Sequence, residues 1–319
     1  MGLGDAERTW STRSGLGEGQ EPDGAGAGCL VARVAARAGR PVNSVDERWD
    51  PRLCVNSLSS QHWTLRQDLE CYERLAIHRI SLFMPKLLKA GLDRAVAEIT
   101  GRGIRVDGIL PGSSFDLLRE ESWSRTQDAL VMGIEVAQRL GATTVQTPGG
   151  TAGGSPYEEA TDRFARAIAP VAAAAVSAGI RLALEPTRPQ FAHIGFVHTV
   201  RDAFALATEL GIWVVPDTAH SWWEPDVAGL LTRGASRIAV MQVADLAFRA
   251  PVLERLVPGD GALPLGRLLG APLAAGFSGP FELEILGSAI ESEGYEGAIR
   301  RSFSYLTALL AGPDQALVG

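Results

Sequence analysis

Oxygen-bearing side chains stand at the ends of four apolar segments in the second half of the chain. Glu185 ends RLALE, Asp217 follows IWVVP, Gln242 lies in RIAVMQV and Glu284 lies in FELEIL. Three carboxylates brought together in a low-dielectric site would repel one another unless a cation lay between them. An all-oxygen ligand set is typical of Mn²⁺ or Mg²⁺, whereas thiolates and imidazoles select Zn²⁺. The four residues predict one divalent metal ion, with Mn²⁺ ahead of Mg²⁺ and Co²⁺.

The elements that must position these residues alternate along the chain. Short apolar strands are expected at 53–57, 79–83, 104–110, 143–147, 181–185, 212–215, 237–243 and 281–286. Segments with helical spacing follow at 64–75, 92–100, 123–140, 156–178, 199–210, 227–232, 265–275 and 295–310. Alternating strands and helices predict a parallel sheet, and eight such units in about 250 residues predict a (β/α)₈ TIM barrel. The alternative, a doubly wound open sheet, is disfavoured because no GxGxxG follows the first strand.

Composition limits the kinds of partner. The chain has 319 residues and a net charge of −7, so it lacks the basic surface that nucleic-acid binding requires. No apolar run is long enough to span a bilayer, and the three cysteines lack CxxC spacing, which fits a reducing, cytoplasmic location. Residues 1–45 are expected to be a largely disordered extension without a secretory signal, 46–312 a single-domain barrel and 313–319 a tail.

Further polar and aromatic residues are expected at the same end of the barrel, where the catalytic residues of this fold stand. Trp222 and Trp223 could wall a sugar-binding site, since pyranose faces pack on indole; the alternative is one core and one rim tryptophan. Lys86, Arg188 and His193 lie on loops at this end and are candidate substrate contacts, with His193 also a candidate acid or base.

Glu282 lies two residues before Glu284, so both side chains face the same side of the strand. Both therefore project into the barrel, and Glu284 is nearer the carboxyl end. We expect Glu282 to be buried and paired in a deeper layer.

Five segments, in this order at strand ends, resemble the xylose isomerase-like TIM barrels, which include sugar isomerases and epimerases: LALEP (182–186), VPDTAHSWW (215–223), MQVAD (241–245), PGDG (258–261) and ELEILG (282–287). The resemblance covers roughly residues 50–310. A glutamine on strand seven is similar to the branch containing hydroxypyruvate isomerase and 3-dehydroshikimate dehydratase. The HSWW segment is similar to inosose dehydratase-like and C-glycoside-deglycosylating relatives.

The resemblance implies roles for particular residues. Glu185, Asp217, Gln242 and Glu284 would ligate the metal, and the two glutamates would serve as acid and base. His220 would contact a substrate hydroxyl and assist proton transfer. Arg249, seven residues after the glutamine, would contact the substrate, or is equally a solvated surface arginine.

The activity implied is a metal-dependent sugar, keto-sugar or keto-acid isomerase or epimerase that abstracts a proton next to a carbonyl through a metal-stabilised enediolate. A lyase, a dehydratase or C-glycoside deglycosidase acting by β-elimination on a 3-keto sugar or cyclic ketone, would use the same metal and base. A non-catalytic binding barrel is the third alternative, although all four ligands are present. The expected partner is a small sugar or keto sugar, and a homodimer is compatible with the family.

Overall fold

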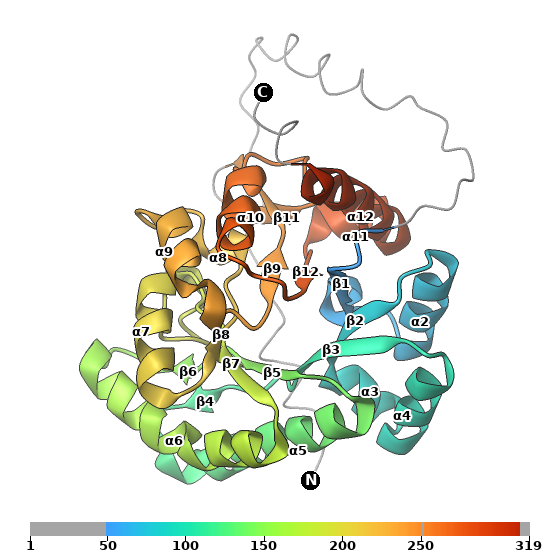
Figure 1. Cartoon of the computed structure of the whole chain (residues 1–319). Coiled ribbons are helices and arrows are strands. Elements are labelled where there is room, and N and C mark those ends of the chain that lie inside the picture. The colour runs from blue at the N-terminus through green and yellow to red at the C-terminus, as the bar shows by residue number, and fades with distance from the viewer. Residues whose placement is uncertain (1–48, 250–251, 313–319) are drawn as a thin grey trace, which may run out of the picture. The chain divides into compact units, whose positions relative to one another are not determined.

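Eight parallel strands form a ring in the middle of the described chain, and helices cover its outer side (Figure 1). The computed structural model describes residues 49–249 and 252–312. In chain order the ring strands are β1 (Leu53–Asn56), β2 (Arg79–Phe83), β3 (Arg105–Leu110), β5 (Thr144–Thr147), β7 (Arg181–Leu184), β8 (Trp213–Val214), β9 (Met241–Val243) and β12 (Phe281–Leu283).

The strands neighbour one another in the order β8-β7-β5-β3-β2-β1-β12-β9, and each of these pairs is parallel. Two single bridges, Val214 with Ile238 and Asp217 with Gln242, connect the segments at the two ends of this order. The bridges close the sheet, and the predicted (β/α)₈ TIM barrel is confirmed.

Helices return the chain from the end of one strand to the start of the next. They are α2 (Leu65–Arg74), α3 (Met84–Ala90), α4 (Leu92–Gly101), α5 (Trp123–Leu140), α6 (Tyr157–Ala178), α7 (Val200–Leu210), α8 (Thr218–Ser221), α9 (Val227–Gly234), α10 (Leu265–Ala274), α11 (Ser288–Glu293) and α12 (Tyr295–Ala311). The eight predicted helices are all present, and α3, α8 and α11 are additional short ones. Buried apolar residues of strands and helices, such as Ile80, Leu69 and Phe303, form a continuous core between the two layers.

Two short strand pairs lie outside the ring and were not predicted. β4 (Phe115–Asp116) pairs with β6 (Gly150–Thr151), and β10 (Asp245–Arg249) forms an antiparallel hairpin with β11 (Val252–Leu256). The Asp245 carboxylate accepts hydrogen bonds from the backbone N–H groups of Gly259, Gly261 and Leu263. This buried carboxylate therefore holds the predicted PGDG turn against the base of the hairpin.

Three ring strands of the second half end earlier than predicted, whereas β9 ends at Val243 as predicted. β8 stops at Val214, two residues before Pro216, which has no N–H to donate to a neighbouring strand. β7 stops at Leu184 and β12 at Leu283. Glu185 and Glu284 therefore stand immediately beyond the strand ends, where a (β/α)₈ barrel carries its functional residues.

Part of the barrel interior is a buried polar network, which lies apart from a small apolar cluster of Ala183, Val215, Ala239 and Val240. Glu282 is fully buried and accepts hydrogen bonds from the amides of Asn56, Gln146 and Gln242. On β3, a Cβ at Gly108 would stand 3.0 Å from the Gln146 side chain, so glycine leaves room for this network. The prediction that Glu282 is buried and paired in a deeper layer is confirmed.

The predicted extension (1–45) and tail (313–319) lie outside the described residues. Of the three cysteines, Cys54 and Cys71 fall within the described part, where both are buried free thiols. Within the same part, no helix combines the length and apolarity needed to cross a membrane.

A buried ion pair joins α2 to α3. The Lys86 ammonium donates to Asp68 Oδ2 at 2.7 Å and to the Ser60 carbonyl oxygen at 2.8 Å. The Ser60 hydroxyl donates to the other carboxylate oxygen of Asp68. Asp68 is fully buried and Lys86 is 7% exposed. The Lys86 ammonium is therefore bound by Asp68 and Ser60 and helps to pack α2 against α3. The substrate contact proposed for Lys86 stays a prediction.

We expect Lys86→Met to destabilise the fold by about 3 kcal/mol, because it leaves the buried Asp68 carboxyl without its cation. The expected loss is at the low end for buried ion pairs, because the Asp68 carboxyl can take up a proton. Burial raises its pKa to about 7, although Lys86 and Ser60 act in the opposite direction. Urea unfolding measures the effect. Lys89→Met, the exposed lysine of the same helix, should change stability by less than about 0.5 kcal/mol. Unchanged stability of Lys86→Met with weaker sugar binding would instead make Lys86 a substrate contact.

Candidate metal and catalytic centre

The four predicted ligands lie on four consecutive strands of the ring. Glu185 follows β7, Asp217 caps α8 just after β8, Gln242 lies in β9 and Glu284 follows β12. None of the four is more than 6% exposed. Asp217 is bridged to Gln242, and Gln242 is in register with Glu282 of β12. Parallel pairing therefore brings the four side chains to one end of the barrel.

A guanidinium that the sequence did not reveal lies among these carboxylates. Arg255 of β11 donates from Nη2 to Asp217 Oδ2 at 2.6 Å, and the same nitrogen is 3.4 Å from Glu284 Oε1. Its Nη1 donates to the Glu284 carbonyl oxygen at 2.7 Å. The predicted Arg249 ends β10, in the other strand of the hairpin, and its side chain lies outside the described part. The one sequence signal for Arg255 was a cation inside the apolar run VLERLV.

The amide of Gln242 has a defined orientation. Its Nε2 lies 3.1 Å from Gln146 Oε1, 3.0 Å from Glu282 Oε1 and 2.9 Å from Glu284 Oε2. Three acceptors on one side require the nitrogen there, since the reverse orientation would place an oxygen against carboxylates. Gln242 Oε1 is consequently left buried without a hydrogen-bond partner. A buried oxygen with a free lone pair beside carboxylates is a suitable cation ligand.

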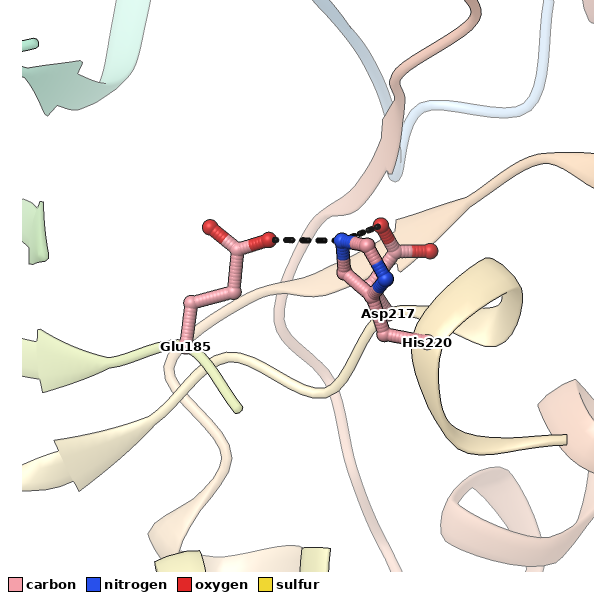
Figure 2. A group of neighbouring side chains, drawn as sticks. All are labelled: Glu185, Asp217 and His220. Carbon is pink, nitrogen blue, oxygen red and sulfur yellow. Dashed lines mark ion pairs between the residues drawn. The ribbon is translucent and has the colours of Figure 1, made fainter. Parts of the chain in front are cut away.

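His220 projects from α8 between two of the carboxylates (Figure 2). Its Nε2 lies 3.7 Å from Glu185 Oε1 and 3.8 Å from Asp217 Oδ2. Burial lowers the pKa of His220 to about 3, in spite of Asp217, so the imidazole is neutral at pH 7 and these contacts are not salt bridges. Arg255 Nη2 lies 3.2 Å from Nε2, so Nε2 acts as an acceptor and the ring proton belongs on Nδ1. Nδ1 has no partner.

The carboxylates differ in their affinity for protons. Burial, reinforced by Glu284 and Asp217, raises the pKa of Glu185 well above its ordinary value. Burial also raises the pKa of Glu284, to about 8, although Arg255 opposes it. At Asp217 burial is outweighed by the charge and hydrogen bond of Arg255 and by the Ala219 N–H, and its pKa is lowered. The centre therefore combines one firmly ionised carboxylate with two glutamates that hold protons strongly.

These residues fit a divalent cation. One potential ligand atom from each of Glu185, Asp217 and His220 lies within 4.8 Å of the others. Glu284 is joined to this group through Arg255, which also binds Asp217, and the buried Gln242 Oε1 is free of hydrogen bonds within the described part. A neutral imidazole with an accepting Nε2 adds a nitrogen to the all-oxygen set that the sequence predicted. The donor set consequently accommodates Zn²⁺ as well as Mn²⁺, Mg²⁺ or Co²⁺.

The remaining predicted contacts lie around this group. Trp222 is partly buried and packs edge-on against Phe248 of β10 at 4.5 Å, whereas Trp223 is 40% exposed and donates to the His220 carbonyl oxygen. This matches the alternative of one packed and one rim tryptophan. Arg188 is buried, and His193 is exposed and stacks on Phe191. Their roles toward a substrate stay predictions.

We expect Glu282→Gln to weaken metal binding by about tenfold or more, because it replaces the anionic acceptor that orients the Gln242 amide. Titration calorimetry with Mn²⁺ and Zn²⁺ measures the affinity. Glu224→Gln is the matched control, since Glu224 is also buried but caps α7 through the backbone of Val200 and Arg201. Equal affinities of wild type and Glu282→Gln would contradict an orienting role.

The metal-free protein should lose stability as the pH rises from about 7 to about 8. Glu284 keeps its proton up to a pKa of about 8 in the folded state but ionises near 4.5 when unfolded, so folding becomes less favourable across that interval. His220, whose pKa falls from 6.5 to about 3, acts in the opposite direction and only below pH 6.5. Urea unfolding with a chelator present measures the slope, which should be shallower in Glu284→Gln. An identical slope in that variant would assign the effect to other groups.

Comparison with known proteins places this centre in a family. The sequence profile described as xylose isomerase-like TIM barrel matches residues 69–309. A comparison with curated protein sequences finds no match.

Solved structures share the fold. The IolI protein with a bound zinc atom superposes with a TM-score of 0.71 at 20% identity, over 82% of this chain and 98% of that one. L-ribulose 3-epimerase superposes with a TM-score of 0.66 at 17% identity, over 82% of this chain and 95% of that one. YcjR of E. coli, a 3-keto-D-glucoside 4-epimerase, superposes with a TM-score of 0.66 at 15% identity, over 82% of this chain and 100% of that one. Since the family profile spans most of its length, the chain belongs to the xylose isomerase-like TIM barrel family.

Proposed function

We propose that the protein is a divalent-metal-dependent isomerase or epimerase of a sugar or keto sugar, which moves a proton next to a carbonyl. The observation that carries the proposal is the pair of buried glutamates with raised pKa, Glu185 and Glu284. They stand beyond β7 and β12, and the two intervening strands carry Asp217 and Gln242 between them. Structural neighbours named as epimerases support the same reaction class.

A divalent cation held by Glu185, Asp217, Gln242 and Glu284 would supply Lewis-acid stabilisation of negative charge on a carbonyl oxygen. Zinc in the IolI neighbour supports a metal here, and Mn²⁺ remains our first choice, with Mg²⁺ and Co²⁺ next. Gln242 would contribute a neutral oxygen to this set. Its amide orientation is maintained by Gln146 and Glu282, which accept hydrogen bonds from its Nε2, while Asn56 donates to the Glu284 carboxylate.

The two glutamates supply the proton transfer. One of them, as carboxylate, removes the proton from the carbon next to the carbonyl. The other, as carboxylic acid, returns a proton to the neighbouring carbon or to the opposite face. A raised pKa suits both steps, because an acid and a base work best when their pKa lies near the operating pH.

The neutral His220 and the charged Arg255 act on oxygen atoms. The unpartnered Nδ1–H of His220 can donate to a substrate hydroxyl, since burial keeps the ring uncharged. Arg255 is fully ionised, because Asp217, Glu284 and Glu185 outweigh the effect of burial and raise its pKa. It places positive charge next to an oxygen that becomes negative during proton removal.

The test combines metal content with hydrogen exchange. Purified protein should hold about one divalent ion per chain, and Asp217→Ala should lose it. With keto sugars in D₂O, the wild type should incorporate deuterium next to the carbonyl, and Glu185→Gln and Glu284→Gln should each slow this by about 10²-fold or more. Glu209→Gln, on the exposed side of α7, is the control and should behave as wild type.

Three outcomes would redirect the proposal. Deuterium uptake accompanied by release of water or an aglycone would indicate the lyase. Uptake that survives both glutamate substitutions would exclude these residues as acid and base. Wild-type protein that stays metal-free after incubation with all the candidate ions would indicate a binding barrel.

A further inference from the structure

One buried guanidinium in this region has no counter-ion among the described residues. Arg188, three residues after Glu185, is 7% exposed, yet no described carboxylate lies within 4.0 Å of it. Its Nη1 donates to the Ala219 carbonyl oxygen at 3.4 Å and its Nη2 to that of Leu253 at 3.1 Å. Its Nε is buried and has no hydrogen-bond partner in the part of the chain that the structure describes.

An arrangement of this kind is energetically costly. Transfer of a charge out of water is unfavourable unless an opposite charge and hydrogen bonds replace the solvent. One long and one ordinary hydrogen bond to carbonyl oxygens leave three of the five N–H donors of Arg188 without a partner among the described residues. The Phe191 ring adds a cation–π contact at 5.2 Å. Arg79, which is also largely buried, shows the usual solution, because Asp107 binds it in bidentate fashion.

Arg188 lies beside the candidate centre. Its partner Ala219 precedes His220, and its partner Leu253 lies two residues before Arg255 in β11. The Phe191 ring contacts both Arg188 and His220, each at 5.2 Å. Burial and the neighbouring charge of Arg255 lower the pKa of Arg188, and Asp217, the carboxylate that opposes this effect, is already bound by Arg255.

The charges of the centre leave Arg188 unmatched. The buried carboxylates of the centre have other partners, since Arg255 binds Asp217 and lies 3.4 Å from Glu284, and amides bind Glu282. Arg188 then presents an additional positive charge at the border of the group, with a free N–H edge. A planar guanidinium edge binds two oxygens of one anion at once, as in pairs with carboxylates and phosphates.

We propose that Arg188 is an anion subsite, and that the substrate carries a carboxylate or phosphate group in addition to its carbonyl. The inference rests on the proposed function for the placing of the carbonyl and adds the chemical class of the substrate. The preferred compounds are sugar acids, keto acids or sugar phosphates, and neutral sugars bind more weakly. The free Nε–H and a neighbouring Nη–H of Arg188 hold the two oxygens of the anionic group.

Three pyranoses that differ at carbon six test the subsite on the Mn²⁺-loaded full chain. Titration calorimetry at fixed ionic strength compares D-glucuronate, D-glucose 6-phosphate and D-glucose. At least one of the two anions should bind about tenfold or more tightly than glucose, and the better one identifies the group as carboxylate or phosphate. Arg188→Gln should abolish this preference, and Arg188→Lys should retain part of it.

Arg181→Gln is the matched control. Arg181 lies at the opposite end of β7, stacks on Trp213 at 4.4 Å and, like Arg188, forms no ion pair within the described part. It should keep the anion preference. The metal affinity of Arg188→Gln should equal that of the wild type, because Arg188 touches none of the proposed ligands.

The proposal is overturned if neither anion binds more tightly than glucose, whether all three bind equally or none binds. It is also overturned if Arg188→Gln keeps the preference for the anion. If that variant in addition unfolds at a lower temperature, the role of Arg188 is structural, namely to hold the β10–β11 hairpin through Leu253. The proposed function is judged separately. Metal binding and deuterium uptake on neutral keto sugars would uphold that function alone, whereas an Arg188-dependent preference in protein that binds no metal would uphold the subsite alone.

Discussion

The positive charge of Arg255 is the feature on which the carboxyl end of the barrel depends. Neighbouring parallel strands bring Glu185, Asp217 and Glu284 into one buried group, and like charges there repel strongly. The guanidinium offsets part of that repulsion and keeps Asp217 ionised. Because the same side chain bonds the Glu284 carbonyl oxygen, it also fastens the β10–β11 hairpin to the strand ends. The hairpin and the acidic group therefore stabilise each other.

A hydrogen-bonded layer deeper in the barrel, around Glu282, supports the centre. Beside a small apolar cluster of Ala183, Val215, Ala239 and Val240, the described strands bury Glu282 with the amides of Asn56, Gln146 and Gln242. A buried carboxylate needs such donors, and the donors in turn acquire fixed orientations. This network directs the Gln242 nitrogen toward Glu282 and Glu284 and leaves its oxygen free of hydrogen bonds within the described part. A centre supported in this way is held in place by its neighbours, as precise ligand geometry requires.

The two buried arginines of the hairpin region, Arg255 and Arg188, differ in their partners. Arg255 has carboxylates around it, whereas Arg188 has carbonyl oxygens and an aromatic ring. In the proposed subsite, Arg188 from the β7 loop would bind the anionic group of the substrate, whereas Arg255 from the hairpin binds the carboxylates of the acidic group.

Local patterns in the sequence determined the barrel, the four candidate ligands and the inward position of Glu282, because alternation of elements and the two-residue period of a strand are properties of neighbouring residues. Contacts between distant segments were decided only in three dimensions. Arg255 reaches Asp217 through an antiparallel hairpin whose pairing leaves no periodic signal, and Arg249, chosen by spacing, lies on the other strand. Lys86 is close in sequence to a strand end, but Asp68 of α2 binds it. Charged side chains pair with whichever opposite charge the folded backbone brings near, so their partners depend on packing rather than on sequence order.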